Sequence, residues 1–338
     1  MKILFIGGTG TISMAITRLL ASRGEELYLL NRGNRSAELP DNVKTIIADI
    51  NDEEDTRKKL EGMTFDCVGE FIGFVPAQLE RDYRLFKDKT KQFIYISSAS
   101  AYEKPPKGYV ITEETPLVNP YWEYSRNKIA CEDYLMERYE KDGFPVTIVR
   151  PSHTYDERSV PLGVHGNGGS WQVVKRIKEG KQVIIHGDGT SLWTITHNSD
   201  FAKAYVGLIG NPKAIGEAFQ ITSDESVSWN SIYKSIAEAL GTELHPYYVA
   251  SETLAAMSDY DFTGSLIGDK SNSVVFDNSK VKKLVPDFKA EISADQGIKM
   301  TVKYILDHPE FQQDDPEYDE WCDRVIEALD KAKSSMKS

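Results

Sequence analysis

A tyrosine and a lysine stand four residues apart in the segment YSRNK, as Tyr124 and Lys128. The surrounding sequence predicts a helix, and four residues make a little over one turn, so both side chains leave the same helix face. A free phenol has a pKa of about 10, and a neighbouring ammonium group favours the phenolate. The same spacing also suits a surface pair, so the choice between the two interpretations depends on the residues that precede it.

A glycine-rich turn in LFIGGTGTIS joins the first predicted strand to the first predicted helix, with Gly7, Gly10 and Ser13 at intervals of three. Glycine lets the backbone turn tightly and approach a pyrophosphate, which the free N–H groups at the helix start then hold. Because the pattern lies between a strand and a helix, it predicts a dinucleotide site rather than a purely structural turn. Ser13 takes the third glycine's place and is small enough for close packing. The residues expected to touch the cofactor at this turn are Gly7, Gly10, Thr11 and Ile12.

The ends of the second and third predicted strands indicate which dinucleotide binds. Asn31, Arg32 and Arg35 follow the second strand, and no carboxylate stands beside them. An acidic residue at this place would bind the ribose hydroxyls of NAD, whereas arginine favours the 2′-phosphate of NADP. We therefore expect NADP, with NAD as the alternative if the arginines are merely solvated loop residues. Asp49 and Ile50, after the third strand, are placed to touch the adenine.

The elements that must position these residues alternate between short apolar runs and amphipathic helical stretches over residues 1–150. This alternation predicts an α/β fold with a Rossmann-type, doubly wound parallel sheet. After residue 151 the alternation loosens, and glycine-rich segments and isolated helices follow. We expect residues 1–150 to form the dinucleotide-binding domain. Residues 151–338 should form mainly a smaller C-terminal α/β substrate-binding lobe, packed against the first and able to add late strands to its sheet.

Composition excludes several classes of function. The net charge of −12 disfavours a nucleic-acid partner, which usually requires a basic surface. No apolar run approaches the roughly 20 residues that span a bilayer, so no membrane partner is expected. Cys67, Cys131 and Cys322 are widely spaced and form no CxxC pair, which predicts reduced thiols in the cytoplasm and neither a disulfide framework nor a zinc site. The histidines show no compact ligand spacing, so we expect no metal.

Four segments in order resemble the extended short-chain dehydrogenase/reductase superfamily, the NAD(P)-dependent epimerase/dehydratase family. These segments are GGTGTIS, ISSASAYE, YSRNK and RPSHTYD, and GDGTSLWTITHNSDFAKAYVGL adds a weaker fifth. The resemblance covers nearly the whole chain. It implies a Rossmann fold, an NAD(P) cofactor, a small sugar-type substrate of the nucleotide-sugar kind, and a homodimer formed through the helix that holds Tyr124.

The resemblance also implies that Ser98, Tyr124 and Lys128 are the catalytic residues. Tyr124 would exchange the hydroxyl proton while hydride moves to or from the nicotinamide, and Ser98 would hydrogen-bond the same oxygen. Lys128 would favour the phenolate and also bind the nicotinamide ribose. Lowering a phenol pKa to about 7 takes roughly 4 kcal/mol, which a desolvated ammonium neighbour can supply. The remaining cofactor contacts implied by the resemblance are Phe71, Pro151 and His153.

Several residues depart from the family pattern. Ala99 and Ser100 replace the acidic pair of the dehydratases, which argues against sugar 4,6-dehydration. Trp193 stands where an arginine often contacts the diphosphate of a nucleotide sugar, which weakens a UDP- or dTDP-sugar assignment. His153 replaces a common asparagine and could bind substrate or act as an acid or base, although a structural hydrogen bond is the simpler interpretation. Glu70 and the bulky residues after it predict a reshaped cofactor pocket. The residues expected to contact substrate are Ser100, His153 and Trp193.

Three functions remain open from the sequence. The first, slightly favoured, is an epimerase-like enzyme that oxidises a sugar hydroxyl and returns hydride to the other face of the ketone. The second is an NADPH-dependent reductase or dehydrogenase of a sugar-like carbonyl, which Arg32 and Arg35 favour. The third is a non-catalytic nucleotide-sensing or RNA-binding protein on the same scaffold. The complete set of Ser98, Tyr124 and Lys128 and the acidic charge argue against the third.

Overall fold

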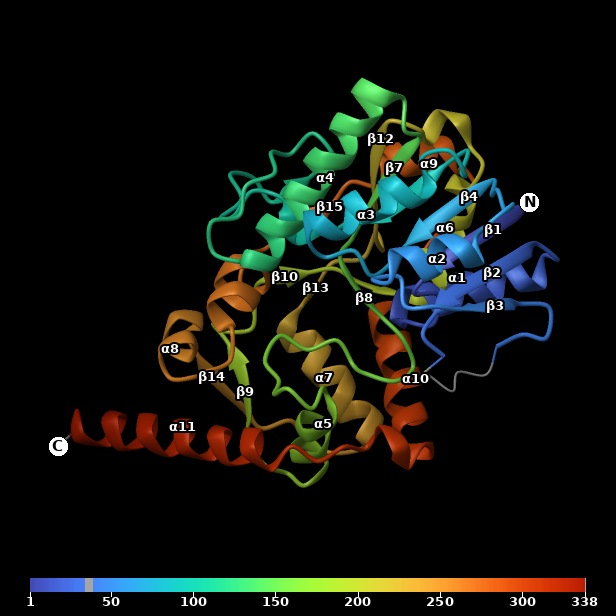
Figure 1. Cartoon of the computed structure of the whole chain (residues 1–338). Helices are drawn as coiled ribbons and strands as arrows, with labels where there is room; N and C mark the ends of the chain where they lie inside the picture. The colour runs from blue at the N-terminus through green and yellow to red at the C-terminus, as the bar shows by residue number, and fades with distance from the viewer. Residues whose placement is uncertain (34–38, 338) are drawn as a thin grey trace.

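A seven-stranded, fully parallel sheet forms the first lobe, in the order β12-β7-β5-β4-β1-β2-β3 (Figure 1). The computed structural model describes residues 1–33 and 39–337, so Arg35, expected at the cofactor phosphate, lies outside the described residues. The strands of this sheet are β1 (Lys2–Ile6), β2 (Glu26–Asn31), β3 (Lys44–Ile47), β4 (Cys67–Glu70), β5 (Phe93–Ile96), β7 (Val146–Pro151) and β12 (Glu217–Ile221). The predicted Rossmann-type fold class is confirmed.

Helices cover both faces of this sheet, which explains why its strands are nearly continuous apolar runs. Along β1, Ile3 and Phe5 join one buried cluster with α1 and α6, while Leu4 and Ile6 join the cluster on the other face with α3 and α4. One face carries α1 (Thr11–Ser22), α6 (Asn198–Leu208) and α9 (Ser279–Leu284). The other carries α2 (Glu53–Lys59), α3 (Pro76–Phe86) and α4 (Glu123–Asp142).

The edge strand of the sheet comes from the second half of the chain. Residues Glu217–Ile221 of β12 pair in parallel with Thr147–Pro151 of β7. Helix α6, also from the second half, packs against α1. Late residues therefore complete the sheet that the first half begins, and the domain boundary at residue 150 stays a prediction.

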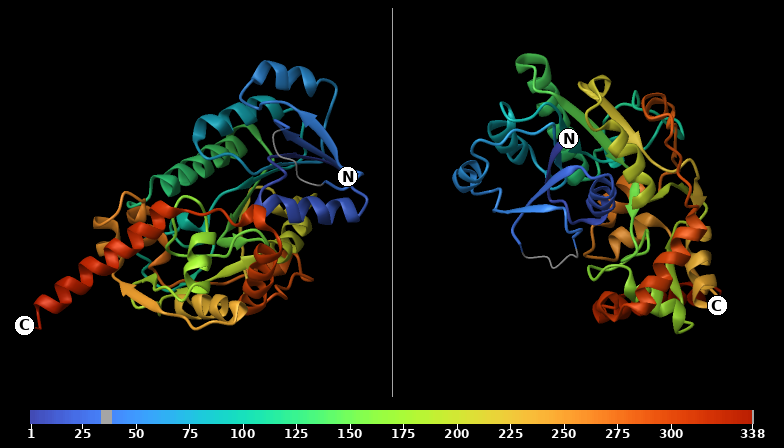
Figure 2. Two further views of the ribbon diagram at one scale, coloured as in Figure 1. Left: turned by 90° about the horizontal axis from the view of Figure 1, so that it is seen from below. Right: turned by 90° about the vertical axis from the view of Figure 1, so that its right-hand side faces the viewer.

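The second lobe has its own apolar core, built from helices and two-stranded pairings below the sheet (Figures 1 and 2). Its helices are α5 (Trp171–Lys178), α7 (Trp229–Leu240), α8 (Ser251–Ala256), a π-helix η3 (Thr263–Lys270), α10 (Ala294–Asp307) and α11 (Pro316–Ser335). Its strand pairs are β8 (His153–Tyr155) with β11 (Ile195–His197), β9 (Val183–His186) with β14 (Pro246–Val249), and β10 (Leu192–Trp193) with β13 (Val227–Ser228). The C-terminal end of α11 extends away from the rest of the lobe.

Short elements connect the two lobes. The pair β6 (Val110–Ile111) and β15 (Val275–Phe276) joins a loop of the first half to a segment that follows the π-helix. The 3₁₀ turns are η1 (Ala99–Ala101), η2 (Pro212–Ala214) and η4 (Pro309–Phe311). Each lobe therefore contributes backbone to the region between them.

The three cysteines are buried and none forms a disulfide. Within residues 1–33 and 39–337, no helix is both long enough and apolar enough to cross a lipid bilayer. The cytoplasmic location expected from the cysteines stays a prediction.

Candidate active site

The glycine turn and the carboxyl ends of the neighbouring strands line a cavity of about 540 Å³. Nine residues expected to contact the cofactor line it: Gly7, Gly10, Thr11, Ile12, Asn31, Arg32, Asp49, Ile50 and Phe71. Ligands of open α/β sheets bind at this edge, outside the carboxyl ends of the strands. The lining residues that the sequence analysis did not name include Thr9, Gly33, Asn51 and Ile96.

The geometry of the turn fits a diphosphate. Gly7 has a φ of +83°, and a Cβ at this residue would lie 2.5 Å from Cγ2 of Ile72, so only glycine is compatible with the turn. The Ser13 hydroxyl donates to the Gly7 carbonyl at 2.8 Å and accepts from the Gly10 N–H at 2.8 Å. Ser13 therefore closes the turn, a role that its size alone did not indicate. No side chain caps the start of α1 and its first turn has no acidic residue, which leaves the helix terminus available to an anion.

The far end of this cavity is lined by the residues after β2 and β3. The Asn31 carboxamide oxygen accepts from the Gly33 N–H at 2.9 Å, which shapes the loop that carries Arg32. Arg32 is exposed and lines the cavity. Asp49 is exposed and Ile50 is buried, and both lie on the same cavity wall. Arginine is the residue type expected to bind a 2′-phosphate, and the Asp49 carboxylate lies on the wall of the same cavity as Arg32.

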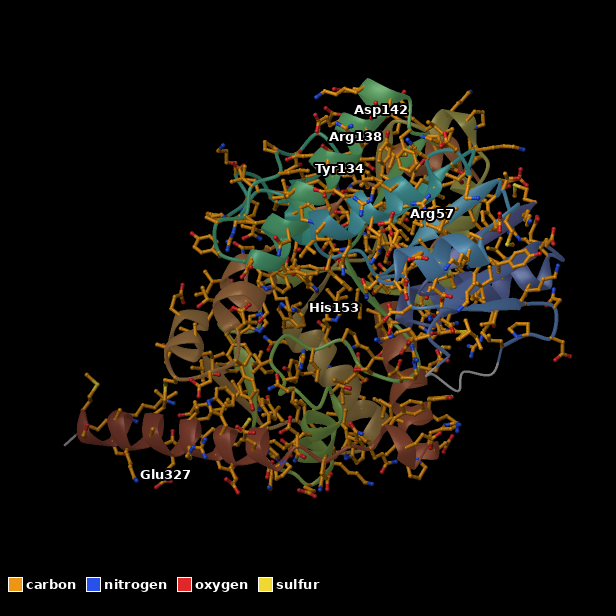
Figure 3. The ribbon with its side chains drawn as sticks, viewed as in Figure 1. Arg57, Tyr134, Arg138, Asp142, His153 and Glu327 are labelled. Atoms are coloured by element: carbon orange, nitrogen blue, oxygen red, sulfur yellow. The ribbon has the colours of Figure 1, made fainter. Side chains whose placement is uncertain are left out.

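A second cavity, of about 270 Å³, lies beyond the end of β5 and is lined by both lobes. It brings together Ser98 and Tyr124 with every residue expected to contact substrate, namely Ser100, His153 and Trp193. Pro151 and His153, expected at the cofactor, line this cavity rather than the first one. His153 lies in the middle of the molecule, between the sheet layer and the helices of the second lobe (Figure 3).

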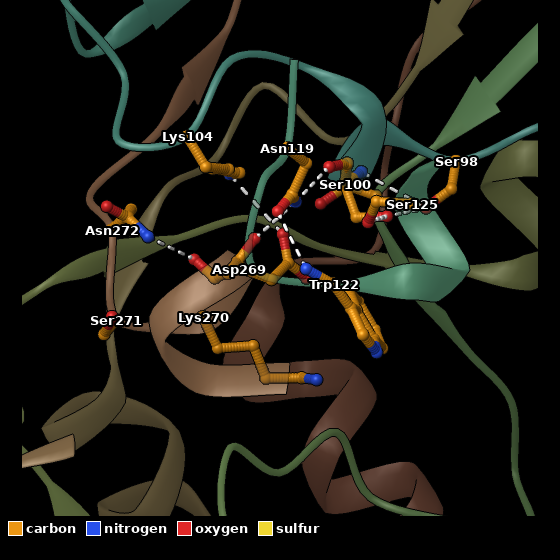
Figure 4. A network of polar contacts seen from close by, with 12 residues as sticks. Ser98, Ser100, Lys104, Asn119, Trp122, Ser125, Asp269, Lys270, Ser271 and Asn272 are labelled. Atoms are coloured by element: carbon orange, nitrogen blue, oxygen red, sulfur yellow. Dashed lines mark hydrogen bonds and ion pairs between the residues drawn. The ribbon is translucent and has the colours of Figure 1, made fainter. Parts of the chain in front are cut away.

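A chain of three serine hydroxyls fixes the loop that follows β5. Ser98 and Ser100 lie 2.9 Å apart between their oxygens, and Ser125, on the helix that carries Tyr124, donates to Ser100 at 2.8 Å (Figure 4). The Ser100 N–H also donates to the Ser98 hydroxyl oxygen at 3.2 Å. Ser100 is buried. Ser100 thus connects the loop after β5 to α4, so the positions of Ser98 and Tyr124 depend on each other.

Lys128 is buried beneath the cavities and lines neither of them. Its ammonium group donates to the backbone carbonyls of Gly73 at 2.7 Å and Ile96 at 2.8 Å, and lies 5.8 Å from the centre of the Tyr124 ring. Burial lowers the pKa of Lys128 to about 8. The helical spacing of four residues therefore does place Tyr124 and Lys128 on one face, directed toward the sheet.

The acidity of Tyr124 does not follow from Lys128 alone. Burial raises the pKa of Tyr124 above its ordinary value, and the interaction with the Ser98 hydroxyl offsets only part of this effect. The protein's own groups therefore do not produce the expected lowering of the Tyr124 phenol pKa. The physical reason is that the same desolvation disfavours the phenolate and the ammonium form of Lys128.

A buried ion pair supports the helix behind Lys128. Arg150 of β7 contacts Glu132 of α4, with 2.6 Å between Nη2 and Oε2, and the Ser97 hydroxyl also donates to Glu132. Glu132 lies one turn after Lys128. Because both charged side chains are almost fully buried, loss of either one would leave an unpaired charge in the core. The pair holds α4 at a fixed position against β5 and β7.

Two polar atoms on the wall of the second cavity lack a partner. Nδ1 of His153 and Nε1 of Trp193 are buried and hydrogen-bond to no residue in the described part of the chain. Burial and the nearby charge of Lys270 lower the pKa of His153 to about 3, so its imidazole is neutral at neutral pH. A purely structural hydrogen bond, the simpler expectation for His153, does not involve this nitrogen. Buried polar atoms without a partner are rare, so these two nitrogens are an unusual feature of the cavity wall.

The segment after β4 departs from the family pattern as expected. Glu70 is fully buried and accepts from the Ile72 N–H at 2.5 Å. Burial, reinforced by the neighbouring Asp82 carboxyl, raises the pKa of Glu70 well above its ordinary value. Phe71 and Ile72 follow it and line the first cavity, between the glycine turn and Ile96. Bulky side chains therefore form this wall of the cofactor cavity.

Sequence reasoning missed the residues that the π-helix and the loop before α4 bring to the second cavity. Lys104, Asp269 and Lys270 line it, and Asn119 lies buried behind them. None of these belongs to a motif with a known spacing. The Asn119–Pro120 dipeptide, which often begins a turn, is the one local signal that marks this loop.

Comparison with known sequences adds to this geometry. The sequence profile of the NAD dependent epimerase/dehydratase family matches residues 3–222. The chain is 26% identical over 253 residues to the chloroplast stem-loop binding protein of 41 kDa b of Arabidopsis thaliana, covering 71% of this chain and 63% of that protein. It is 22% identical over 290 residues to the 2′-dehydrokanamycin reductase of Streptomyces kanamyceticus, covering 86% of this chain and 80% of that protein.

Solved structures show the same fold. The epimerase Mth375 of Methanothermobacter thermautotrophicus superposes with a TM-score of 0.74 at 17% sequence identity, over 92% of this chain and 93% of that one. At this identity the match concerns the architecture of the chain and not its substrate.

Proposed function

Because this chain belongs to the NAD-dependent epimerase/dehydratase family, we propose that it transfers hydride between NAD(P) and a secondary alcohol or ketone of a sugar-type substrate, in the manner of an epimerase. The observation that carries the proposal is that Ser98 and Tyr124 line one cavity at the end of β5, next to the cavity of the glycine turn. The first cavity would hold the dinucleotide and the second the substrate. When bound, the oxidised nicotinamide supplies a hydride acceptor and a positive charge.

In this proposal, Tyr124 takes the proton from the substrate hydroxyl, or returns it, and Ser98 orients the same oxygen. Lys128 already donates to two backbone carbonyls, and an ammonium group has three donors, so one donor is left for a cofactor ribose. The raised pKa of Tyr124 in the protein alone means that its phenolate needs additional positive charge nearby. Proton transfer should therefore be efficient only in the cofactor complex.

The second cavity does not favour a dehydratase. Elimination of water needs an acid and a base beside Ser98, but Ala99 and Ser100 occupy those positions. Among the described lining residues the carboxylate is Asp269, and it pairs with Lys104 at 3.4 Å. A carboxylate held in an ion pair is a weak base for proton abstraction.

The proposal is tested by Tyr124→Phe. We expect turnover on a panel of nucleotide sugars, sugar phosphates and free sugars to fall by at least about 100-fold, because the phenol is the proton carrier. NAD(P) binding, measured by calorimetry, should change little, because Tyr124 does not line the first cavity. The matched control is Tyr121→Phe, an exposed tyrosine in the loop just before the helix that holds Tyr124, which should behave like the wild type. Equal activity of the two variants would overturn the proposed role of Tyr124.

An NADPH-dependent reductase is the second candidate, and Arg32 is the observation that favours it. Its place on the wall of the first cavity, after a β2 strand that ends in Asn31 and not in a carboxylate, supports selection of a 2′-phosphate. One of the similar sequences is itself named a reductase. The nucleotide released on denaturing the purified protein, identified by mass spectrometry, separates the two candidates. Retained NAD indicates an epimerase that recycles its cofactor, whereas an empty site that prefers NADPH indicates a reductase.

RNA binding is the third candidate, supported by similarity to a relative named for stem-loop binding. The net charge of −12 opposes it, because nucleic-acid affinity depends largely on phosphate neutralisation. Filter binding with stem-loop RNA at two salt concentrations tests it. A tight, salt-dependent complex that is unaffected by Tyr124→Phe would favour this candidate over either enzyme.

A further inference from the structure

The second cavity contains an ammonium group whose charge the protein does not balance. Lys270, at the C-terminal end of the π-helix, lines the cavity and is half-buried. Its ammonium group forms no hydrogen bond or ion pair with the residues that the structure describes, and it points toward the indole of Trp122 (Figure 4). The centre of that ring lies 5.7 Å from Nζ. Its nearest identified contact is therefore an aromatic face.

The other charged groups that line the cavity neutralise each other. Lys104 is buried, and its ammonium group lies 3.4 Å from a carboxylate oxygen of Asp269. His153 is neutral, as described above. Asp269 also attracts Lys270, but the two ammonium groups of Lys104 and Lys270 against this one described carboxylate leave one net positive charge in a space that is partly shielded from water, and desolvation lowers the pKa of Lys270 from the ordinary value. Such a charge is unfavourable unless a ligand supplies the opposite charge.

The usual role of a lysine at the end of a helix does not explain Lys270. Such lysines neutralise the last carbonyl groups of the helix. In this π-helix those carbonyls already have other donors. The Lys270 carbonyl accepts from Nε1 of Trp229 at 3.0 Å and lies 3.2 Å from Nε2 of His186. The Asn272 carboxamide donates to the Ile267 carbonyl at 3.0 Å.

The backbone at the end of the π-helix is thus held by several hydrogen-bond donors, while the ammonium group of Lys270 has no hydrogen-bond or ion-pair partner among the described residues. π-Helical segments are rare and are frequently found at functional sites, and this eight-residue one places two consecutive charged residues, Asp269 and Lys270, on the cavity wall. Asp269 is used to hold Lys104. Lys270 lines the cavity without such an ion pair among the described residues.

We propose that Lys270 binds an anionic group of the substrate, a carboxylate or a phosphate, and that the enzyme selects anionic sugars over neutral ones. This inference rests on the proposed function, because it takes the second cavity as the substrate site. The cavity of about 270 Å³ lies below the roughly 300–1,000 Å³ of drug-sized ligand sites, so it suits a single sugar unit. The Trp122 indole offers a face on which a sugar ring can stack.

Anion binding at Lys270 would also bring the sugar to the proposed catalytic residues. Ser98, Tyr124 and Lys270 line the same cavity. A charge-assisted hydrogen bond from an ammonium group in a partly dry site is roughly twice as strong as a neutral one. Lys270 would therefore contribute both affinity and orientation, and the unpartnered nitrogens of His153 and Trp193 would bind neutral oxygens.

The test is a calorimetric titration of the cofactor-loaded protein with three probes: methyl glucoside, glucuronate and glucose 6-phosphate. We expect the wild type to bind at least one anionic probe about tenfold or more tightly than methyl glucoside. Lys270→Gln should lose this preference, and Lys270→Arg should keep most of it. The matched control is Lys107→Gln, which removes a lysine that is paired with Glu103 at the surface, and it should keep the preference.

The outcomes distinguish a carboxylate ligand from a phosphate ligand. They also distinguish the inference about Lys270 from the proposed function. Tighter glucuronate binding identifies a carboxylate, and tighter glucose 6-phosphate binding identifies a phosphate. Anion preference that persists in Lys270→Gln, or an absence of anion preference in the wild type, overturns the inference. Binding requires no turnover, so this result is independent of Tyr124→Phe. If Tyr124→Phe loses turnover while the wild type shows no anion preference, the proposed function stands and only the role of Lys270 is rejected.

Discussion

Lys128 is held by the backbone of two strand ends rather than by an acidic side chain. Its ammonium group donates to the carbonyls of Gly73 and Ile96, so its position is fixed by the sheet. No carboxylate within the described residues forms an ion pair with it, and burial lowers the pKa of Lys128 to about 8. The residue is therefore poised to change charge in a range where enzymes commonly work.

The lowered pKa of Lys128 predicts how the unfolding free energy of the protein depends on pH. Between pH 8 and pH 10.5 the unfolded chain keeps the Lys128 proton while the folded protein has lost it, so the unfolding free energy contributed by Lys128 rises with pH. We expect the difference in unfolding free energy between the wild type and Lys128→Met to shift in favour of the wild type by up to ~3 kcal/mol over this range. Urea unfolding at a series of pH values measures it.

The control for this experiment is Lys107→Met, because Lys107 is strongly exposed at the surface. Its unfolding free energy should run parallel to that of the wild type at every pH. Parallel curves for Lys128→Met as well would show that Lys128 keeps its ordinary pKa in the folded protein.

At the scale of elements, Asn119 connects three segments around the second cavity. Its carboxamide nitrogen donates to the carbonyls of Ser100 and Gly268, each at 2.8 Å (Figure 4). Its oxygen accepts from the N–H groups of Tyr121 at 3.1 Å and Trp122 at 3.2 Å. One buried side chain therefore fixes η1, the start of α4 and the π-helix relative to one another.

We expect Asn119→Ala to lower the unfolding free energy by about 2 to 4 kcal/mol, because it leaves buried backbone groups on three elements without partners. Turnover should fall as well, since Ser100 and Trp122 lose their common support. Thermal unfolding and the substrate panel measure the two effects. Asn211→Ala is the control. It removes only the cap of an exposed 3₁₀ turn, so its cost should stay near 1 kcal/mol with activity intact. Equal effects of the two substitutions would contradict the connecting role of Asn119.

Elements with a strong local signal could be predicted from the sequence. Strand and helix alternate through the first half, and α1 ends close to Gly24, whose φ of +73° marks the expected helix stop. The glycine turn was recognisable because its residues are adjacent in the chain. Strands of two residues, such as β6 and β15, carry no period of their own, so their pairing could not be predicted.

The residues of the candidate site likewise include some whose place could be predicted from the sequence and some whose place could not. The motif residues, including Ser98 and Tyr124, could be placed because each lies at the end of a predictable strand or on a predictable helix. Lys270 and Asp269 reach the cavity only through the tertiary packing of the π-helix, which no local pattern indicates. The unpartnered nitrogen of His153 likewise depends on what surrounds it and not on its place in the sequence.

At the scale of the whole molecule, the outer surface of α4 is the expected site of dimerisation. The strongly exposed large hydrophobic side chains of the described chain lie outside α3 and α4. The surface of these helices offers instead a cluster of tyrosine and arginine: Arg138 lies 5.6 Å from the ring centre of Tyr134 and 5.8 Å from that of Tyr83 (Figure 3). Tyrosine and arginine are the residues enriched at the centres of interfaces.

We therefore expect sedimentation equilibrium to give twice the mass of one chain, and Tyr134→Glu to give a single chain, because a carboxylate would be buried at the interface. Tyr248→Glu, an exposed tyrosine of the second lobe, should remain a dimer. A wild-type protein that stays monomeric at high concentration would contradict dimerisation through α4.

The late origin of β12 has a consequence for how the chain reaches its fold during synthesis. A ribosome completes β7 well before it makes residues 217–221, so for that interval β7 is an open edge that no strand covers. The sheet can be completed only after the intervening segment of the second lobe has been synthesised. The β12–β7 pairing that completes it joins distant parts of the chain. The sheet of the first lobe is therefore complete only after residues 217–221 of the second half have been synthesised.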